Sequence, residues 1–316
     1  MVKLKVWLVL ILLWVIIGST YIAIKIAIDT IPPFLMSGIR YVLSGTLLIL
    51  VYILIPSQNN SYGTHLSHRC KLVSILNKRQ WKEATIIGCA LILGGQGLLA
   101  WGEHYLSSSV TALLFSTVPI WVLLLGKIIY GEKLKKFTVL GVITGTVGFV
   151  ILIFPSLAAQ FVETGTSNVK FEFVGIIALA IAAISWSVGS LYSTKADLPT
   201  DVLISTGMML FVGGIFLIVL SIAIGELQNF HVSAISMPSM ISLLYLVTVG
   251  SVGWAGFFWV LRNTSASLAN TFAYVSPVVA VILGWVILSE AITPQIIIAT
   301  VIIMTGVVLI ANKGQL

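Results

Sequence analysis

The sequence predicts an all-α polytopic membrane protein with ten transmembrane helices, arranged as two inverted five-helix repeats. Three observations support this prediction: the composition, the spacing of apolar runs and an internal repeat. Of 316 residues, 59% are hydrophobic and 9% are charged, and the mean hydropathy is +1.11. A soluble domain carries about a quarter charged residues, so this chain has too few to cover a globular surface in water.

Apolar runs long enough to cross a bilayer follow one another along nearly the whole chain. They are continuous and rich in Leu, Ile and Val, without the alternation that is typical of outer-membrane barrel strands. We therefore expect helical spans at 6–28, 33–55, 84–104, 107–129, 137–155, 173–193, 202–224, 239–261, 267–289 and 295–312.

The net charge of +7 reflects membrane topology. With ten spans, the basic residues outside them fall almost entirely on one side, and Lys170 alone lies on the other. This positive-inside pattern predicts a multi-pass protein of the cytoplasmic (inner) membrane with both termini in the cytoplasm. Because position explains the charge, we expect no nucleic-acid partner.

An internal repeat appears when residue numbers are shifted by 158. The shift needs no gap across spans three to five and eight to ten. It aligns Trp101 with Trp259, Ser107 with Ser265, Ser109 with Ser267, Pro119 with Pro277, Gly126 with Gly284, Glu132 with Glu290 and Gly148 with Gly306.

The repeat predicts an inverted architecture. Each half has five spans, an odd number, so the second half enters the membrane from the opposite side, as in many secondary transporters. We expect a first repeat at 1–155 with a cytoplasmic loop at 56–82, an extracytoplasmic linker at 156–172 and a second repeat at 173–316.

Two stretches carry a family resemblance. "WVIIGSTYIAIKIA…PPF…GIRYVLSGTLL" and "GGQGLLAWGEHYLSSSVTALLFSTVPIWVLLLGKIIYGEKL" resemble helices of the EamA family, in the drug/metabolite transporter superfamily. The resemblance covers the chain as two EamA repeats and is weaker in the second, where Ser289 replaces the glycine before Glu290. It implies ten helices with both termini inside, and transport, usually export, of small metabolites.

Polar and aromatic residues in the spans are the candidates for a substrate cavity, because intramembrane polar groups usually face a cavity or a partner. Trp14, Gly18, Tyr21 and Lys25 follow one helical stripe. Similar stripes or single polar groups elsewhere complete the candidate set: Arg40, Gln96, Trp101, Glu103, Trp186, Tyr192, Trp259, Asn270 and Tyr274.

Several candidates have a second interpretation. Lys25 either meets substrate or reaches the membrane surface or Asp29. Arg40 either pairs with a carboxylate of the protein or holds substrate. Trp101 and Trp259 also suit an interfacial belt, and Trp254 and Phe258 suit a lipid-facing or core role better than a ligand platform.

Pro119 and Pro277 are expected to kink helices four and nine. His65, His68 and Cys70 in the cytoplasmic loop lack a fourth ligand, so we expect neither a metal site nor a cofactor.

The predicted function is secondary transport, as export of an amino acid, a sugar or an amphipathic drug-like compound by alternating access. The chain has no P-loop motif, so it does not supply its own ATPase. A flippase for lipid-linked substrates and a membrane-embedded enzyme are the alternatives, the enzyme being disfavoured by the absence of H-E-x-x-H and G-x-S-x-G motifs. The expected partners are a small-molecule substrate and the lipid bilayer; the sequence leaves open the participation of protons or of a second copy in a homodimer.

Glu103 ends span three and is interpreted as a gate or coupling residue at the outer mouth. Burial would raise the proton affinity of its carboxylate, whereas a close Arg40 would lower it. Glu103→Gln should impair pH-driven transport in proteoliposomes while leaving the protein folded. Normal transport by this variant at every pH would contradict the interpretation.

Overall fold

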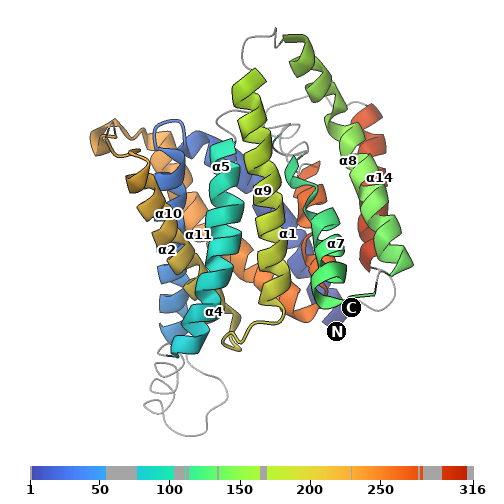
Figure 1. Ribbon diagram of the computed structural model, residues 1–316, viewed down its shortest axis with the longest axis horizontal. Helices are drawn as coiled ribbons and strands as arrows, with labels where there is room; N and C mark the ends of the chain where they lie inside the picture. Colours follow the sequence, from blue (N-terminus) through green and yellow to red (C-terminus); the bar gives the residue numbers. More distant parts are fainter. Residues whose placement is uncertain are drawn as a thin grey trace, which may run out of the picture.

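The computed structural model describes residues 2–54, 77–102, 111, 114–133, 135–163, 169–228, 230–276, 278–279 and 294–311, and within these ranges every regular element is helical. Figure 1 shows the helices as one bundle. The elements are α1 Val2–Ala27, α2 Pro33–Leu54, α4 Lys78–Gly88, the π-helix η1 Cys89–Gly97, α5 Leu98–Gly102, α7 Val118–Tyr130, α8 Lys136–Glu163, α9 Val169–Ser193, α10 Val202–Ala223, the short 3₁₀-helix η2 Val232–Ala234, α11 Met237–Asn263, α12 Ala266–Ala269 and α14 Pro294–Ala311.

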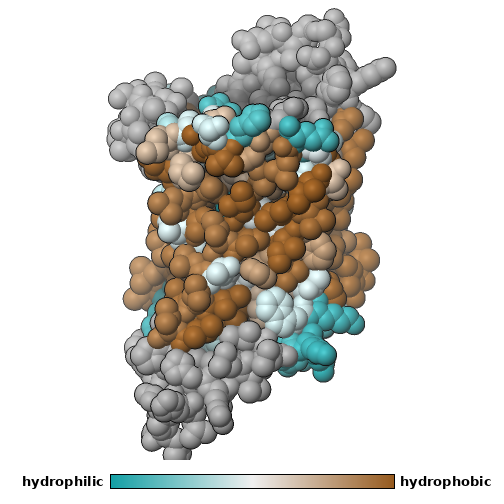
Figure 2. All heavy atoms as spheres, turned by 90° about the vertical axis from the view of Figure 1, so that its left-hand side faces the viewer, coloured by the Kyte–Doolittle hydropathy of each residue, from teal (hydrophilic) through white to brown (hydrophobic). Residues whose placement is uncertain are grey.

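The helices form a membrane-spanning bundle. Six helical segments of the described chain are long and apolar enough to cross a membrane: Leu4–Ile24, Pro33–Leu54, Lys78–Gly102, Val174–Ser193, Val202–Ala223 and Met237–Asn263. Shorter apolar helices occupy Val118–Tyr130, Lys136–Leu152 and Pro294–Ile310. Figure 2 shows a belt of hydrophobic side chains between two more hydrophilic ends. Residues 277 and 280–289 of the span expected at 267–289 lie outside the described residues, so the count of ten stays a prediction.

Helices α2 and α10 are antiparallel and touch through glycines. A Cβ atom at Gly38 would lie 3.2 Å from the carbonyl oxygen of Gly214, and one at Gly45 would lie 2.6 Å from that of Gly207. Residue numbers rise along α2 as they fall along α10, which makes the helices antiparallel. Small residues allow such close backbone approach between membrane helices.

Helices α8 and α14 repeat this arrangement. A Cβ atom at Gly141 would lie 2.6 Å from the carbonyl oxygen of Gly306, and one at Gly148 would lie 2.8 Å from the backbone nitrogen of Ile303. Figure 1 shows the two helices side by side. Helices α2 and α10 come second, and α8 and α14 fifth, in the expected repeats. Equivalent helices that run antiparallel are the signature of two inverted halves.

The remaining long helices also pair across the halves, the first helix of each repeat with the third of the other. Helix α1 packs along α11, and α9 packs along η1. On the first pair, Ser19 Oγ and Tyr245 OH share a hydrogen bond of 2.6 Å, and Ser239 Oγ donates to the Ile26 carbonyl oxygen over 2.8 Å. On the second, Ser185 Oγ donates to the Ala90 carbonyl oxygen over 2.8 Å.

Carboxylates fix where two of the helices begin. Glu226, from the turn after α10, accepts hydrogen bonds from the backbone N–H groups of Phe34 (3.2 Å) and Leu35 (3.0 Å) in the first turn of α2. Asp201 accepts one from the Leu203 N–H over 2.8 Å at the start of α10. Negative groups at helix N-termini satisfy free N–H groups and match the helix dipole. Glu226 therefore ties the start of α2 to the opposite half.

The third span is not a uniform α-helix. It is α-helical over α4, π-helical over η1 and α-helical again over α5. Within η1, a Cβ atom at Gly94 would lie 2.2 Å from Ser185 Oγ, and one at Gly95 would lie 3.1 Å from Cε3 of Trp186. Two glycines therefore let α9 lie against η1. π-Helical turns occur frequently at functional sites.

The α2–α10 contact yields a stability prediction. Gly45→Ala places a methyl group 2.5 Å from the Phe211 backbone nitrogen, so the helices must separate. We expect a loss of about 1–3 kcal/mol, the range for overpacking a tight contact, seen as a lower melting temperature in detergent. Gly250→Ala is the matched control, because its Cβ atom would have nothing within 4 Å. Equal melting temperatures for the two variants would contradict the contact.

Candidate functional site: a cavity between the two halves

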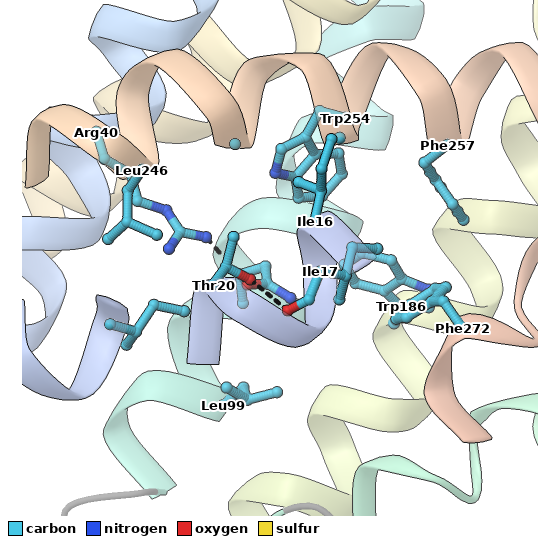
Figure 3. A pocket seen from close by; sticks show the side chains of 14 residues that line it. Ile16, Ile17, Thr20, Arg40, Leu99, Trp186, Leu246, Trp254, Phe257 and Phe272 are labelled. Carbon is cyan, nitrogen blue, oxygen red and sulfur yellow. Dashed lines mark hydrogen bonds between the residues drawn. The ribbon is translucent and has the colours of Figure 1, made fainter. Parts of the chain in front are cut away.

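A cavity lies where α1, α2 and the η1–α5 segment face α9 and α11, with about 630 Å³ of space free of protein atoms, the open mouth included. Both halves supply its wall, as expected of a site at a repeat interface. The lining residues are Ile16, Ile17, Thr20, Ile24, Arg40, Gln96, Leu99, Trp186, Leu246, Gly250, Gly253, Trp254, Phe257 and Phe272. Figure 3 shows the Arg40 side chain extending from its helix toward the middle of this group.

One corner of the cavity is polar. Arg40 Nη2 donates to the Tyr41 hydroxyl and, over 3.4 Å, to Gln96 Oε1. Tyr41 OH donates to the same Gln96 oxygen over 3.0 Å. The Arg40 carbon Cζ lies 4.3 Å from the Tyr41 ring centre, within the range of a cation–π contact. These contacts fix the guanidinium group against α2 and η1.

The opposite wall is aromatic. The Trp186 ring centre lies 5.4 Å from that of Trp254, 5.5 Å from that of Phe257 and 5.6 Å from that of Phe272. Trp254 also meets the Tyr41 ring edge to face at 5.7 Å, which joins the aromatic wall to the polar corner. Rings at these separations attract one another beyond simple burial. The cavity thus offers a continuous aromatic surface beside a cation.

Trp186 is held from behind by Asn270. The indole Nε1–H donates to Asn270 Oδ1 over 2.7 Å, and the Asn270 amide donates to the Ala266 carbonyl oxygen over 2.8 Å. Ser190 Oγ lies 3.5 Å from the same Asn270 oxygen. All these polar side chains are buried, so each hydrogen bond stabilises a group that would otherwise be unsatisfied. Asn270 therefore positions a wall residue without lining the cavity.

Two glycines of α11 leave space for the cavity because they carry no side chain. Gly250 and Gly253 line it, and a Cβ atom at Gly250 would meet nothing within 4 Å. A Cβ atom at Gly253 would lie 2.8 Å from Cγ2 of Ile16, so Gly253 also permits the approach of α1.

The structure brings three of the expected site residues to the cavity wall: Arg40, Gln96 and Trp186. Trp14 is buried away from the wall with its ring 6.3 Å from that of Trp7, and Gly18 packs against Val279. Tyr274 is buried beside α8, where its hydroxyl shares a hydrogen bond of 3.0 Å with Thr146.

Other expected residues lie elsewhere. Tyr192 OH donates to Glu83 Oε2 over 2.6 Å, at the end of the bundle where α4 begins. Trp101 and Trp259 are half-buried and do not line the cavity. Pro119 stands in the first turn of α7, after a turn at Ser116 and Thr117. The side chains of Tyr21 and Lys25, and the whole of Glu103 and Pro277, lie outside the described residues.

Sequence reasoning missed part of the wall. Trp254 was expected to face lipid or the core, yet it lines the cavity, and Phe257, Phe272 and Thr20 were not considered. Tyr41, next to Arg40 in the chain, completes the polar corner. One usable signal was present: Gly250, Gly253 and Trp254 follow one another at helical spacing, as expected of a helix face with small residues beside a ring.

The Trp186–Asn270 hydrogen bond can be measured in a double-mutant cycle. Asn270→Ala should cost about 1–3 kcal/mol, because it leaves a buried indole N–H unsatisfied. In the Trp186→Phe background, Asn270→Ala should cost about 1 kcal/mol less than in the wild type, since no indole donor remains. Unfolding in a mixed-detergent titration provides the measurement. Additive effects would show that the hydrogen bond contributes nothing.

Comparisons with known proteins agree with this architecture. The chain is 29% identical to the uncharacterized inner membrane transporter YedA of Escherichia coli K12, over 94% of this chain and 88% of that protein. It is 26% identical to the uncharacterized transporter YoaV of Bacillus subtilis, over 96% and 95%. A solved structure described only as the crystal structure of a protein shares the fold, with a TM-score of 0.70 at 20% identity over 98% of this chain and 95% of that one. The model of the EamA-like transporter family matches residues 4–154 and 173–312, so the chain belongs to this family.

Proposed function

We propose that the protein is a secondary transporter that moves a small amphipathic metabolite through the cavity by alternating access, in the direction of export. The observation that carries the proposal is that both inverted halves supply the cavity wall. A site at such an interface can be exposed to either side when the halves rock against each other. Membership of a transporter family supports the same activity.

The position of the cavity along the bundle supports an outward-facing state. Lining residues of α1 lie between Ile16 and Ile24, toward its C-terminal end. Arg40 lies about two turns after the start of α2, and Gln96 lies about two turns before the end of α5, both toward the end of the bundle where α1 ends. Trp186 and Phe257 lie about two turns before the opposite ends, those of α9 and α11, and form the inner end of the cavity. Figure 1 shows the start of α1 and the end of α14 at the same end of the bundle. If the positive-inside pattern sets the topology, this end is cytoplasmic, and the cavity extends from Trp186 and Phe257 near its inner end into the outer half, where Arg40 and Gln96 lie.

Contacts between the halves support closure at the cytoplasmic end. Beyond the aromatic wall, Tyr192 of α9 donates to Glu83 of α4 over 2.6 Å. Arg79 of α4 forms an ion pair of 3.1 Å with Asp197, after α9. The pair is exposed, so it contributes at most about 1 kcal/mol. Contacts of this strength can break when the halves reorient.

A cavity-filling variant tests transport through this route. Gly250→Leu adds a side chain where the protein has open space, so it should occupy the cavity without straining the fold. In counterflow assays with proteoliposomes and a panel of amino acids, sugars and organic acids, we expect any wild-type activity to fall at least tenfold. The melting temperature should stay the same or rise, because leucine favours helices over glycine.

Gly256→Leu is the matched control. Gly256 lies on the same helix, does not line the cavity, and its Cβ atom would meet only Val9, at 3.7 Å. This variant should retain transport. Full activity of folded Gly250→Leu protein would refute transport through the cavity.

A further inference from the structure

Arg40 is a buried cation at the cavity wall, and one of its donor atoms has no partner. Its side chain is 6% exposed, and Nη1 has no hydrogen-bond partner, whereas Nη2 is bonded to Tyr41 and Gln96. An arginine keeps its positive charge at any physiological pH. Burying a charge costs free energy unless it is paired and hydrogen-bonded, and intramembrane cations commonly mark substrate pathways.

Three of the described carboxylates are engaged with other groups. Glu83 accepts from Tyr192, Asp197 pairs with Arg79, and Glu226 accepts from Ser221 Oγ over 2.7 Å as well as from the start of α2. The described part of the cavity wall contains no Asp or Glu. The polar partners that Arg40 does have, Tyr41 and Gln96, are neutral. The positive charge is therefore uncompensated by the residues that the structure describes.

The geometry beside Arg40 favours an apolar body attached to an anion. Tyr41 meets both the guanidinium group and the Trp254 ring, so a ligand whose anionic group pairs with the guanidinium has the aromatic wall next to it. Arginine's planar fork suits carboxylates, which can accept two parallel hydrogen bonds. The described wall offers no carboxylate to receive a ligand ammonium group.

We propose that the cavity is a binding site for organic anions, in which a carboxylate pairs with Arg40 and an aromatic or aliphatic body lies against Trp254 and Trp186. This inference rests on the proposed transport function and narrows its substrate class. It also resolves the two interpretations of Arg40 in favour of substrate. The favoured ligands are monocarboxylates without a neighbouring cationic group.

Three matched compounds test the inference on the full-length protein in detergent. 3-Phenylpropanoate carries the anion, 3-phenylpropanamide replaces it with a neutral group of the same shape, and L-phenylalanine adds an ammonium group. By isothermal titration, the wild-type protein should bind the propanoate about 10- to 100-fold more tightly than the amide, the usual effect of a charged hydrogen-bond partner. Phenylalanine should bind more weakly than the propanoate.

The variant arm assigns the preference to one residue. Arg40→Gln should bring the affinities for propanoate and amide to within about twofold, mainly by weakening the propanoate. Arg262→Gln is the matched control, because Arg262 ends α11 outside the cavity and donates to the Thr200 carbonyl oxygen over 2.7 Å. It should keep the wild-type preference. If Arg40→Gln does not fold, the wild-type comparison still decides.

Several results of these titrations would contradict an anion site in the cavity. Equal binding of propanoate and amide by the wild type, no binding of the propanoate, tighter binding of phenylalanine, or an unchanged preference in folded Arg40→Gln would overturn the inference. Counterflow of labelled propanoate distinguishes a failure of the anion-site inference from a failure of the transport proposal. Selective binding without counterflow retains the anion site and counts against transport, whereas counterflow of both compounds at equal rates retains transport and removes the anion site.

Discussion

The architecture depends on two places where helix backbones touch with no side chain between them. At the α2–α10 and α8–α14 contacts, glycines allow the carbonyl oxygens of one helix to lie where a Cβ atom would clash. Apolar side chains gain little by leaving lipid for one another, so membrane helices associate through close packing of this kind. Since both contacts join equivalent helices running in opposite directions, they also hold the two halves in inverted orientation.

The position of the cavity follows from the inverted orientation of the two halves. With α2 and α10 joined, the remaining pairs α1–α11 and α9–η1 face each other across the space between the halves. Their contacts are made mainly by side chains and single hydroxyl groups, such as Ser19 with Tyr245 and Ser185 with the Ala90 carbonyl. Gly250 then leaves open space in the wall, while Trp186 and Trp254 form its aromatic side.

Much of the fold could be predicted from the sequence, because length and hydropathy determine which segments cross a bilayer. The repeat was equally informative: Gly148 and Gly306, matched by the shift, both lie at the α8–α14 contact. The cavity wall was harder to predict. Tyr192 follows Trp186 on α9 but points about 120° away from it around the helix. Hydropathy does not reveal which of the two faces meets the cavity, and Tyr192 instead donates to Glu83.

The π-helix and the aromatic wall were difficult to predict, for different reasons. The π-helix from Cys89 to Gly97 changes the angular step between residues, so α-helical spacing cannot be carried through this part of the third span. Trp254 and Phe257 are apolar residues in an apolar span, and composition cannot separate a ring that faces ligand from one that faces lipid. A charged residue inside a span is different, which is why Arg40 could be singled out.

The guanidinium of Arg40, which no carboxylate of the described residues neutralises, also bears on the energetics of the proposed transport cycle. If the protein works by alternating access as proposed, it passes through a state sealed from both solutions. An empty sealed state would confine this charge without water and without a counterion from the described residues, at a cost of several kcal/mol. A carboxylate in the pocket removes that penalty. We therefore expect the loaded protein to reorient more readily than the empty one, so that one anion is exchanged for another faster than net flux proceeds: an antiporter enforced by a single positive charge.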